Sequence, residues 1–479
     1  MKRTWVLLFA VLICSIGFSQ EKFGISNSNY SSSNSIFLNP SSSVDCRTYI
    51  QYNIAGAQVF AKSNFGYLPN FKYSSALQTK TINRSNSQTK QFLYAVVNGQ
   101  GPGLIISKRM YGGGFFTRIR NVTDMRNVSY QLASAFLNEN GFNPEQSRDL
   151  LGQDIKNARL ATMTWAEYGI NFGKMIKRQQ DIIIALAGNI KYNTGVNIYY
   201  ANLIEFDSFT NADGSFGVNR LDGTVRNNQA AWKSGRGWGL DLGITYKIME
   251  DYVDKYLANS KLSNCNYVDY KIKIGLSLLD LGYVRFKTNT TRTDVSGAGY
   301  FDPKRIDTAF TDVIKSNFKN ETVEGKPITA TLPTALSGQM DYNFDNDFYL
   351  NVTVVKNLIP TRMIGVPGAD VLVICPRYET LPIEVGLPFA LQKFRYPNLG
   401  FMLRLRSMVF GVDNIFPLFM ARNTNNVGVY FSLGISLFRN PACKTKRLTV
   451  ADCIKFATGK GKKRHKEVDF GSKKKRRRR

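Results

Sequence analysis

A strict alternation of apolar residues with small or polar residues over positions 238–248 constrains the fold of this chain most. The apolar positions are Trp238, Leu240, Leu242, Ile244, Tyr246 and Ile248, and between them stand Gly239, Asp241, Gly243, Thr245 and Lys247. A period of two over this length predicts a β-strand with one apolar face.

The alternation recurs along the chain and predicts an all-β protein of about 14 strands, an even number as in single-chain bacterial barrels. The expected strands are residues 47–61, 91–98, 104–118, 163–172, 182–191, 238–248, 270–278, 334–344, 348–356, 371–376, 382–394, 399–406, 408–413 and 427–438. They leave too little apolar surface for a soluble core. We therefore expect an antiparallel up-and-down transmembrane β-barrel whose apolar face contacts lipid.

A soluble β-sandwich or β-solenoid would show the same alternation within each strand. Aromatic residues near both ends of the 238–248 strand, and Leu437-Phe438 at the end of the last strand, favour the membrane barrel. Composition agrees, because 13% of the 479 residues are aromatic although the mean hydropathy is only −0.23. Beyond the first 20 residues, no stretch approaches the roughly 18 consecutive apolar residues of a membrane helix.

The expected connections differ in length. Residues 119–157, 200–236 and 287–333 lack alternation and are expected as long loops on one side of the barrel, while most turns on the other side are short. Residues 250–264 would be a long connection on the short-turn side. We expect tight turns at residues 101–103 (Gly-Pro-Gly) and 345–347 (Asp-Asn-Asp).

The start of the chain has the layout of a secretory signal peptide over residues 1–20, with Lys2 and Arg3 before an apolar stretch. We expect cleavage after Ser19 or Gln20. Lipidation of Cys14 is disfavoured, because Ile13 stands where a small residue is required. Residues 21–46 are rich in Ser and Asn and predict an irregular segment, part of which docks through the apolar residues that precede Asn39-Pro40.

The net charge of +28 is concentrated at the other end of the chain. Residues 439–479 hold 17 Lys and Arg against three acidic residues, a net charge of +14. Because a secreted chain seldom meets nucleic acid, we expect anionic lipid, peptidoglycan or an acidic protein as the partner of this tail, and no nucleic acid. A disordered, solvated extension is the alternative. The tail ends in Lys473, Lys474, Lys475, Arg476, Arg477, Arg478 and Arg479.

Residues for common catalytic machinery are scarce. The single histidine, His465, lies in the tail, so the barrel offers neither a Ser-His pair nor a His-bearing zinc site. Five cysteines follow the signal peptide without CxxC spacing, and either Cys443 and Cys453 form a disulfide or the thiols are free. We predict no enzymatic activity, no cofactor and no metal.

Alternation places several charged side chains on the lumen face. Glu167 and Asp241 could act as paired carboxylates, but the lining of a wet lumen explains them more simply. The basic ones could bind an anionic solute or only line the lumen. The glycine runs 112–114 and 235–239 lack the Lys-Ser/Thr helix of a phosphate loop and are expected in curved strands. The lumen candidates are Glu167, Asp241, Lys271, Lys273, Arg404 and Arg406.

Asp307-Thr308-Ala309 matches a short O-glycosylation pattern of the Bacteroidota. Thr308 is therefore a candidate for modification, and a chance match is the alternative.

Several blocks resemble a known family. Phe37-Leu38-Asn39-Pro40 resembles the Asn-Pro-Ala segment of FadL-like (fatty-acid-transporter-like) outer-membrane barrels, with Ser41 where Ala is usual. Residues 237–246, 278–283, 332–334 and 410–414 resemble blocks of a Bacteroidota outer-membrane barrel family of uncharacterised function. That family is similar to the PorP/SprF-like and PorV-like barrels of type IX secretion and gliding. The resemblance covers most of residues 30–438 and implies a lumen plugged by the N-terminal segment.

We therefore expect a signal peptide (1–20), a plug segment (21–46) that includes Phe37, Asn39 and Pro40, a barrel (47–438) in the Gram-negative outer membrane, and a basic tail (439–479). An even strand number places both termini in the periplasm. The leading hypothesis is passage or handover of a hydrophobic small molecule past the plug. The alternatives are an adaptor of a type IX secretion or gliding-type surface complex, with periplasmic or surface protein partners, and a soluble periplasmic binding protein.

Overall fold

The computed structural model describes residues 22–75, 83–84, 90–129, 154–210, 216–254, 256–259, 268–301, 319–344, 346–360 and 363–438. The expected signal peptide and basic tail, His465 and Thr308 lie outside these residues.

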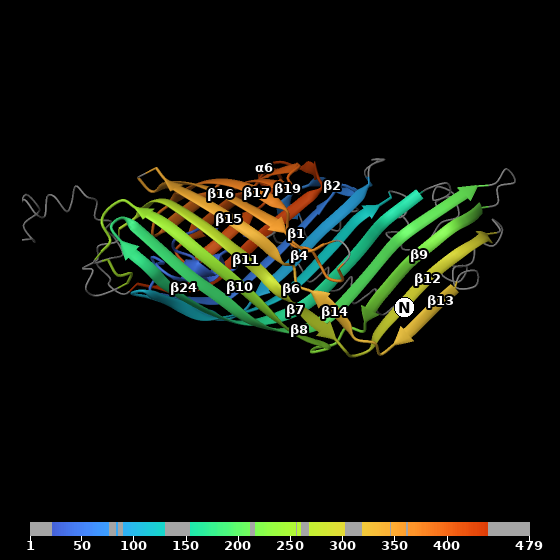
Figure 1. Ribbon diagram of the computed structural model, residues 1–479. Helices are drawn as coiled ribbons and strands as arrows, with labels where there is room; N and C mark the ends of the chain where they lie inside the picture. The colour runs from blue at the N-terminus through green and yellow to red at the C-terminus, as the bar shows by residue number, and fades with distance from the viewer. Residues whose placement is uncertain are drawn as a thin grey trace, which may run out of the picture.

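The body of the molecule is a closed antiparallel barrel of 14 strands, which confirms the predicted fold class (Figure 1). The first strand, β1 (Ile50–Ser63), pairs with the last, β24 (Asn426–Leu437), and this pairing closes the sheet. Because closure pairs the backbone of both terminal strands, the barrel wall has no open edge there.

The wall runs from β1 through β4 (Gln91–Gln100), β5 (Gly103–Lys108), β6 (Tyr111–Val128), β7 (Asp154–Gln179), β8 (Ile182–Thr210), β10 (Gly235–Met249) and β11 (Tyr270–Phe286). It continues through β14 (Ile328–Thr331), β15 (Ala335–Asn343), β16 (Phe348–Asn357), β17 (Val371–Glu379), β18 (Ile383–Gly386), β19 (Phe389–Gln392), β20 (Tyr396–Leu399), β21 (Phe401–Leu405) and β22 (Met408–Val412) to β24. Some labels are successive pieces of one wall strand.

The outer face of the wall is apolar and the inner face is polar. On β7 and β8, Ile170, Phe172 and Ile190 are 61–67% exposed, whereas Glu167 and Lys191 are fully buried toward the lumen. On β10, every expected apolar position points outward and every intervening residue points inward. This is the arrangement that a wall between lipid and a polar interior requires.

Aromatic side chains border this apolar band. Tyr168, Tyr192, Trp238 and Tyr283 stand opposite one another on four adjacent strands. Tyr246 follows Trp238 eight positions along β10, or roughly 26 Å at ~3.3 Å per residue. This distance, shortened by the strand tilt, is of the same order as the ~25 Å apolar band of outer-membrane barrels.

The connections are short at one end of the barrel, the short-turn end, where β1 begins and β24 finishes. Among the described wall strands, the turns there follow β5, β7, β15, β17 and β21, and the connection from β10 to β11 is the long exception, as expected. The opposite end, the long-connection end, carries the other connections. β15 and β16 pair as an antiparallel hairpin, as expected from the sequence.

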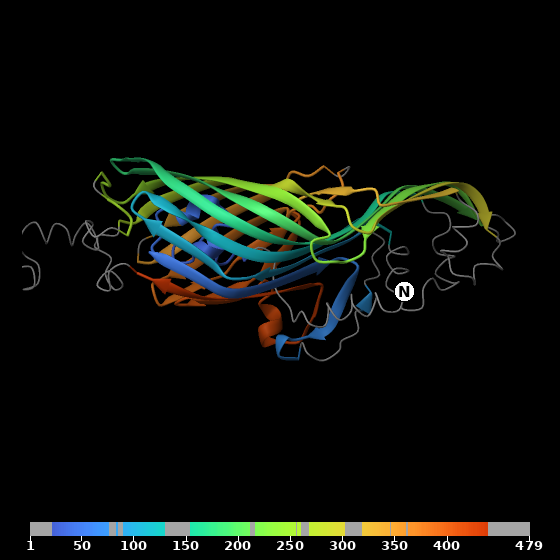
Figure 2. The same ribbon diagram turned by 90° about the horizontal axis from the view of Figure 1, so that it is seen from below.

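The described parts of two expected long loops, residues 200–210 with 216–236 and residues 287–301 with 319–333, are largely strands, so that prediction was wrong. The outer part of β8, β9 (Phe216–Asn228), β12 (Thr290–Phe301) and β13 (Lys319–Glu324) form an arm that continues the sheet beyond the barrel (Figures 1 and 2). Beyond the barrel neither face of a strand has to be apolar, so the alternation that marks wall strands is absent.

The turn expected at Gly101-Pro102-Gly103 was also wrong. Both β4 and β5 pair with β1 in one continuous direction, so these residues interrupt a single strand. Pro102 has no N–H for the sheet, which explains the break. The chain turns instead after Lys108, where Arg109 adopts a left-handed conformation with φ 58°.

A small group of elements lies beside the barrel at the long-connection end (Figure 2). It comprises β2 (Gly66–Phe71), η2 (Tyr73–Ser75), β3 (Asn83–Arg84), α6 (Phe416–Phe419) and β23 (Arg422–Thr424). None of the described helices is long and apolar enough to cross a membrane.

Candidate functional site

Residues 22–49, called the N-terminal segment below, lie inside the barrel (Figure 1). The segment contains two short helical turns, α2 (Ser32–Ser35) and η1 (Pro40–Ser43). Its apolar residues pack against the inner wall: Phe23 and Leu38 join one cluster with β15–β17, and Ile36 joins Ile105 and Phe116.

The Ser and Asn side chains of this segment bind the polar inner wall on several sides. Asn27 donates to Asn351 on β16 (2.9 Å), and Ser28 donates to Glu384 on β18 (2.6 Å). Asn29 donates to Tyr270 on β11 (2.9 Å). A Ser/Asn-rich composition therefore serves here to satisfy the hydrogen-bonding groups of a polar lumen.

The Asn39-Pro40 motif is fitted to glycines of the wall. Asn39 Nδ2 donates to Gln339 Oε1 (3.0 Å), and its Oδ1 accepts from the Ser41 hydroxyl (2.6 Å). A Cβ on Gly243 would lie 2.2 Å from Asn39 Oδ1 and 2.8 Å from Pro40 Cδ. Only glycine leaves room for this approach, which accounts for a glycine at this position of the alternating strand.

Charged side chains hold the segment at both ends. Lys22 Nζ donates to Asn34 (2.7 Å) and Gln100 (2.6 Å), and burial, with the Arg118 guanidinium second, lowers the pKa of Lys22 to about 7. At the other end Arg47 pairs with Asp269 (2.8 Å). Between these ends, Asp45 accepts from Lys247 Nζ (2.7 Å).

A buried ion network lies on the long-connection side of the segment. Glu167 pairs with Arg118 and Arg120, Lys191 pairs with Asp241 (2.6 Å) and Asp280, and Arg120 also pairs with Asp280 (2.7 Å). These residues come from five adjacent strands and form the upper ion network: Arg118, Arg120, Glu167, Lys191, Asp241 and Asp280. Its three cations and three anions balance, as burial of charge requires.

Local backbone geometry places Asp280 in this network. Asp280 has φ 53°, and the β10–β11 register shifts between Leu240 and Leu242 opposite it. This bulge turns both Leu279 and Asp280 inward. The Asp280 N–H then donates to Asp241 Oδ1 (2.6 Å), so two of the resemblance blocks meet at one contact.

A second network surrounds the segment toward the short-turn end. Arg377 binds Asp341 through both terminal nitrogens (2.9 and 2.7 Å) and pairs with Glu379 (2.8 Å), while Arg404 pairs with Glu384 (2.7 Å). The lower ion network consists of Arg47, Asp269, Lys273, Asp341, Arg377, Glu379, Glu384 and Arg404.

Above the upper ion network, toward the long-connection end, the lumen is filled by apolar side chains. This apolar layer includes Phe60, Trp165, Tyr200, Leu332 and Phe286, all at most 3% exposed. The connection between β16 and β17 folds onto it: Val366 belongs to the layer, and Gly365 bridges Thr331. The interior is thus layered as apolar side chains, ion network, and N-terminal segment with a second ion network.

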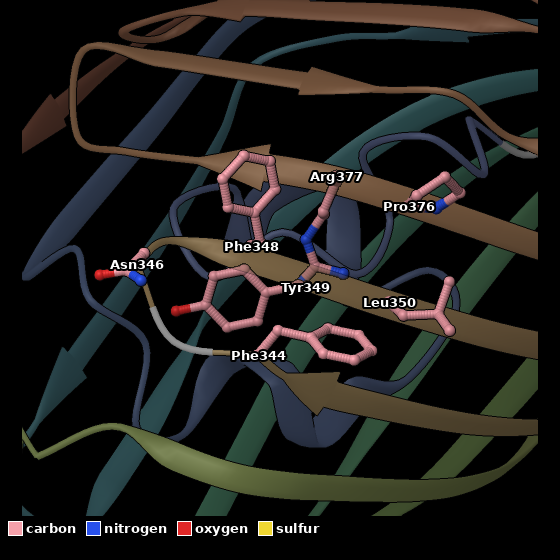
Figure 3. A pocket seen from close by; sticks show the side chains of 7 residues that line it. All are labelled: Phe344, Asn346, Phe348, Tyr349, Leu350, Pro376 and Arg377. Carbon is pink, nitrogen blue, oxygen red and sulfur yellow. The ribbon is translucent and has the colours of Figure 1, made fainter.

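One hollow lies on the wall of the barrel and another lies beside the N-terminal segment. A hollow of about 500 Å³ lies on the outer wall around the β15–β16 turn, where Phe344, Phe348, Leu350 and Pro376 surround it (Figure 3). Inside, the space between the N-terminal segment and the wall near Thr245 and Lys273 amounts to about 40 Å³. The inner space has room for a few water molecules only.

The structure places four of the six lumen candidates inside. Glu167, Asp241, Lys273 and Arg404 point inward and all form ion pairs. These four side chains are therefore members of the two ion networks. Glu167 and Asp241 each pair with cations, so they do not form a free pair of carboxylates.

Lys271 and Arg406 do not line the lumen, and their expected inward direction was wrong. A register shift at the start of β11 places Lys271 outside, 5.3 Å from the centre of the Tyr342 ring. Arg406 is an exposed turn residue with φ 53° between β21 and β22. Alternation counted along the sequence fails at both positions because a bulge or turn resets the register.

Sequence reasoning missed most of both networks. Arg118 and Arg120 alternate with Ile119, but the expected strand ended at residue 118. Asp280 was visible only as part of a resemblance block. A longer count of alternation would have found the arginines, whereas the inward turn of Asp280 depends on the bulge.

Within the described part of the chain, no group of three or more His, Cys, Asp or Glu side chains could hold a metal ion. Cys46 and Cys375 are buried free thiols.

The chain was compared with known proteins. No curated protein matches it in sequence. Among solved structures, it is similar to a TodX deltaS2S3 mutant monoaromatic hydrocarbon channel (10% identity, 87% of this chain and 96% of that chain, TM-score 0.44). It is also similar to the P. putida toluene transporter TodX (9% identity, 84% and 92%, TM-score 0.38).

A family match covers most of the chain. A family profile matches residues 40–413, which is well over half of the chain and begins at Pro40. It includes the wall residues of both ion networks but not residues 22–39 of the N-terminal segment. The chain therefore belongs to DUF5723, a family of unknown function.

Proposed function

We propose that this protein is an outer-membrane barrel that takes up a hydrophobic small molecule and hands it on past the N-terminal segment, which acts as a plug. The observation that carries this proposal is the apolar layer inside the barrel, between the long-connection end and the upper ion network. A polar ligand would gain little binding free energy from such a layer. An apolar ligand would gain binding free energy there, because its surface is removed from water.

Onward transfer requires rearrangement, because the segment is hydrogen-bonded to the inner wall on several sides and the hollow beside Thr245 and Lys273 measures only about 40 Å³. The segment is held mainly by hydrogen bonds and ion pairs, which exchange for water contacts at modest net cost. Movement of residues 22–49 toward the short-turn end would open the lower lumen while the wall pairing of β1 with β24 stays intact.

A reversible lock on the plug tests the proposal. The hydroxyls of Ser41 and Thr245 are 2.6 Å apart, so the double variant Ser41→Cys/Thr245→Cys places two thiols within reach of a disulfide. In Gram-negative cells that express this variant, we expect uptake of radiolabelled oleate to fall to background under oxidation and to recover after reduction. The controls are the single variants Ser41→Cys and Thr245→Cys, treated with the same oxidant. Equal uptake by the locked and reduced forms would refute plug movement.

The second candidate function is an adaptor in a surface secretion or motility complex, with the termini in the periplasm. The observation that favours it is the arm formed by β8, β9, β12 and β13, which no barrel needs for closure. Affinity capture from detergent-solubilised membranes separates the two functions. A stoichiometric protein partner that is lost when the arm is shortened supports the adaptor, whereas oleate uptake that survives the same shortening supports transport.

A further inference from the structure

The outer wall near the short-turn end carries lysines inside its apolar face. On β7, Lys174 is exposed and stands between Phe172 and Ile176, which are 65% and 55% exposed. A lysine on the lipid face of a barrel is unfavourable unless its ammonium group reaches the interface or meets an anion. An anion outside the protein would therefore stabilise Lys174 at this position.

Neighbouring strands bring further basic groups to the same place. Lys108 on β5 and Lys174 on β7 stand directly opposite Tyr111 on the intervening strand β6. The two lysines are thus separated by two strand spacings, or about 10 Å. Lys174 Nζ lies 5.7 Å from the centre of the Tyr111 ring. Lys177 follows on β7 after a register shift and shares the outer face.

Among the described residues, no carboxylate lies within ion-pair distance of Lys108, Lys174 or Lys177. In the lumen, by contrast, Lys191 and Lys247 each have an acidic partner. The outer lysines therefore form a patch of like charge that an external anion would stabilise.

The wall beside this patch is apolar. The next outward position on β6 is Gly113, which has Ile106 and Phe172 opposite it on either side. Tyr111 and Phe115, the neighbouring outward residues of β6, are 50% and 45% exposed. A phosphate at the lysines and an acyl chain against these apolar residues match the two chemical parts of a phospholipid.

We propose that Lys108, Lys174 and Lys177 form, with Tyr111, a binding site for the phosphate of an anionic phospholipid at the short-turn rim of the barrel. The inference rests on the membrane location in the proposed function, but it needs neither transport nor plug movement. The lysine ammonium groups supply the charge, and the tyrosine hydroxyl supplies a hydrogen-bond donor at the interface.

The chain provides a matched control at the opposite rim. Arg236 and Arg285 stand opposite each other on the outer faces of β10 and β11, next to Trp238 and Tyr283. They are exposed and basic, as are the lysines, but lie at the long-connection end. If any basic residue at a rim of the barrel bound an anionic phospholipid, substitution of the arginines and substitution of the lysines would have the same effect.

The test is native mass spectrometry of the full mature barrel, released from detergent after equilibration with phosphatidylglycerol, phosphatidylcholine or lipid A. For the wild type we expect preferential retention of phosphatidylglycerol. The variant K108Q/K174Q/K177Q should lose this preference by at least about tenfold, a conservative fraction of three basic contacts. R236Q/R285Q should keep it.

Three results would overturn the assignment: equal retention of phosphatidylglycerol and phosphatidylcholine by the wild type, full retention by the lysine variant, or loss of lipid A alone in that variant. Heat-modifiable migration on gels checks folding, and the single variant K174Q serves if the triple variant fails to fold. Because the measurement is made on purified protein, loss of oleate uptake in cells would leave its outcome unchanged, and the two proposals fail independently.

Discussion

At the scale of single residues, glycines of the wall decide how closely the N-terminal segment approaches. The Ser43 carbonyl lies against Gly112, and Asn39 and Pro40 lie against Gly243. A Cβ on either glycine would lie 2.2 Å from an atom of the N-terminal segment. These positions look like ordinary small residues of an alternating strand in the sequence. The structure explains why these two positions are glycines, because a larger residue would collide with the N-terminal segment.

The variant Gly243→Ala should therefore loosen the segment without disrupting the strand. We expect a destabilisation of about 1–3 kcal/mol, as for other overpacked interiors. Amide hydrogen exchange across residues 22–49 should become faster. The control is Gly338→Ala on β15, where a Cβ would meet nothing within 4 Å. Equal exchange in both variants would contradict the fit of Asn39-Pro40 to Gly243.

Lys22 should make docking of the segment depend on pH. Its pKa is about 7 when docked, against about 10.4 in water, so the undocked state binds more protons between these values. Docking is therefore weakest below pH 7 and strengthens as pH rises toward 10, by up to about 1.4 kcal/mol per pH unit. Hydrogen exchange of residues 22–49 should be slower at pH 9 than at pH 6, after correction for intrinsic rates. Lys22→Met should remove this difference, and a wild-type segment insensitive to pH would contradict the prediction.

At the scale of elements, each of the five strands β6, β7, β8, β10 and β11 contributes one or two charges of a single sign to the upper ion network, so that neutralisation requires neighbouring strands. The upper ion network draws on five strands, and its members are more than 160 positions apart at the extremes. Removing one partner leaves buried charge uncompensated, whereas an exposed ion pair is replaced by water.

Arg377→Met should accordingly be far more damaging than Lys356→Met. Arg377 is 1% exposed and holds both Asp341 and Glu379, so its loss should cost about 3–5 kcal/mol. Lys356 is 56% exposed and pairs only with Asp370 among the described acids, so its loss should cost about 0–1 kcal/mol. Urea unfolding of the refolded barrel in lipid vesicles measures both. Similar midpoints for the two variants would mean that the network is not desolvated.

Removal of residues 21–45, most of the N-terminal segment, should change the lumen rather than the wall. Deleting residues 21–45 takes away the contacts that Ser28, Asn39 and Asp45 make with the wall while the β1–β24 closure remains. We expect ion leakage through planar bilayers to rise above that of the intact protein. Deletion of residues 444–479 is the control, since it leaves the segment in place. Unchanged leakage after the first deletion would count against a plug.

At the scale of the whole molecule, alternation along the sequence predicted the barrel because lipid outside and a polar lumen inside impose opposite demands on neighbouring residues. β10 shows this directly, with each expected direction observed. The same signal failed for the arm, where both faces of β9 and β12 are free to be polar. It also failed for Lys271, Arg406 and Gly101-Pro102, where bulges, turns and a proline reset the register.

The candidate site was less accessible to sequence reasoning than the fold. Glu167 and Asp241 could be placed inward, but their partners Arg118 and Lys191 sit on other strands, and pairing across strands depends on register. The Asn39-Pro40 motif marked the segment, whereas its contacts with Gly243 and Gln339 are separated by 200 positions or more. Such contacts follow from closure of the barrel and have no local signature.

The central claim is that the outer apolar band contacts acyl chains while polar groups and the N-terminal segment fill the interior. Electron paramagnetic resonance of a spin label at Ile190→Cys tests it most directly, with Ala231→Cys as the exposed control and Cys265, Cys443 and Cys453 replaced by Ser. In lipid vesicles, the account predicts that dissolved oxygen relaxes the label at position 190 and an aqueous nickel chelate does not, with the reverse at position 231. A label at position 190 that is open to the nickel chelate, or shielded from both reagents, would contradict it.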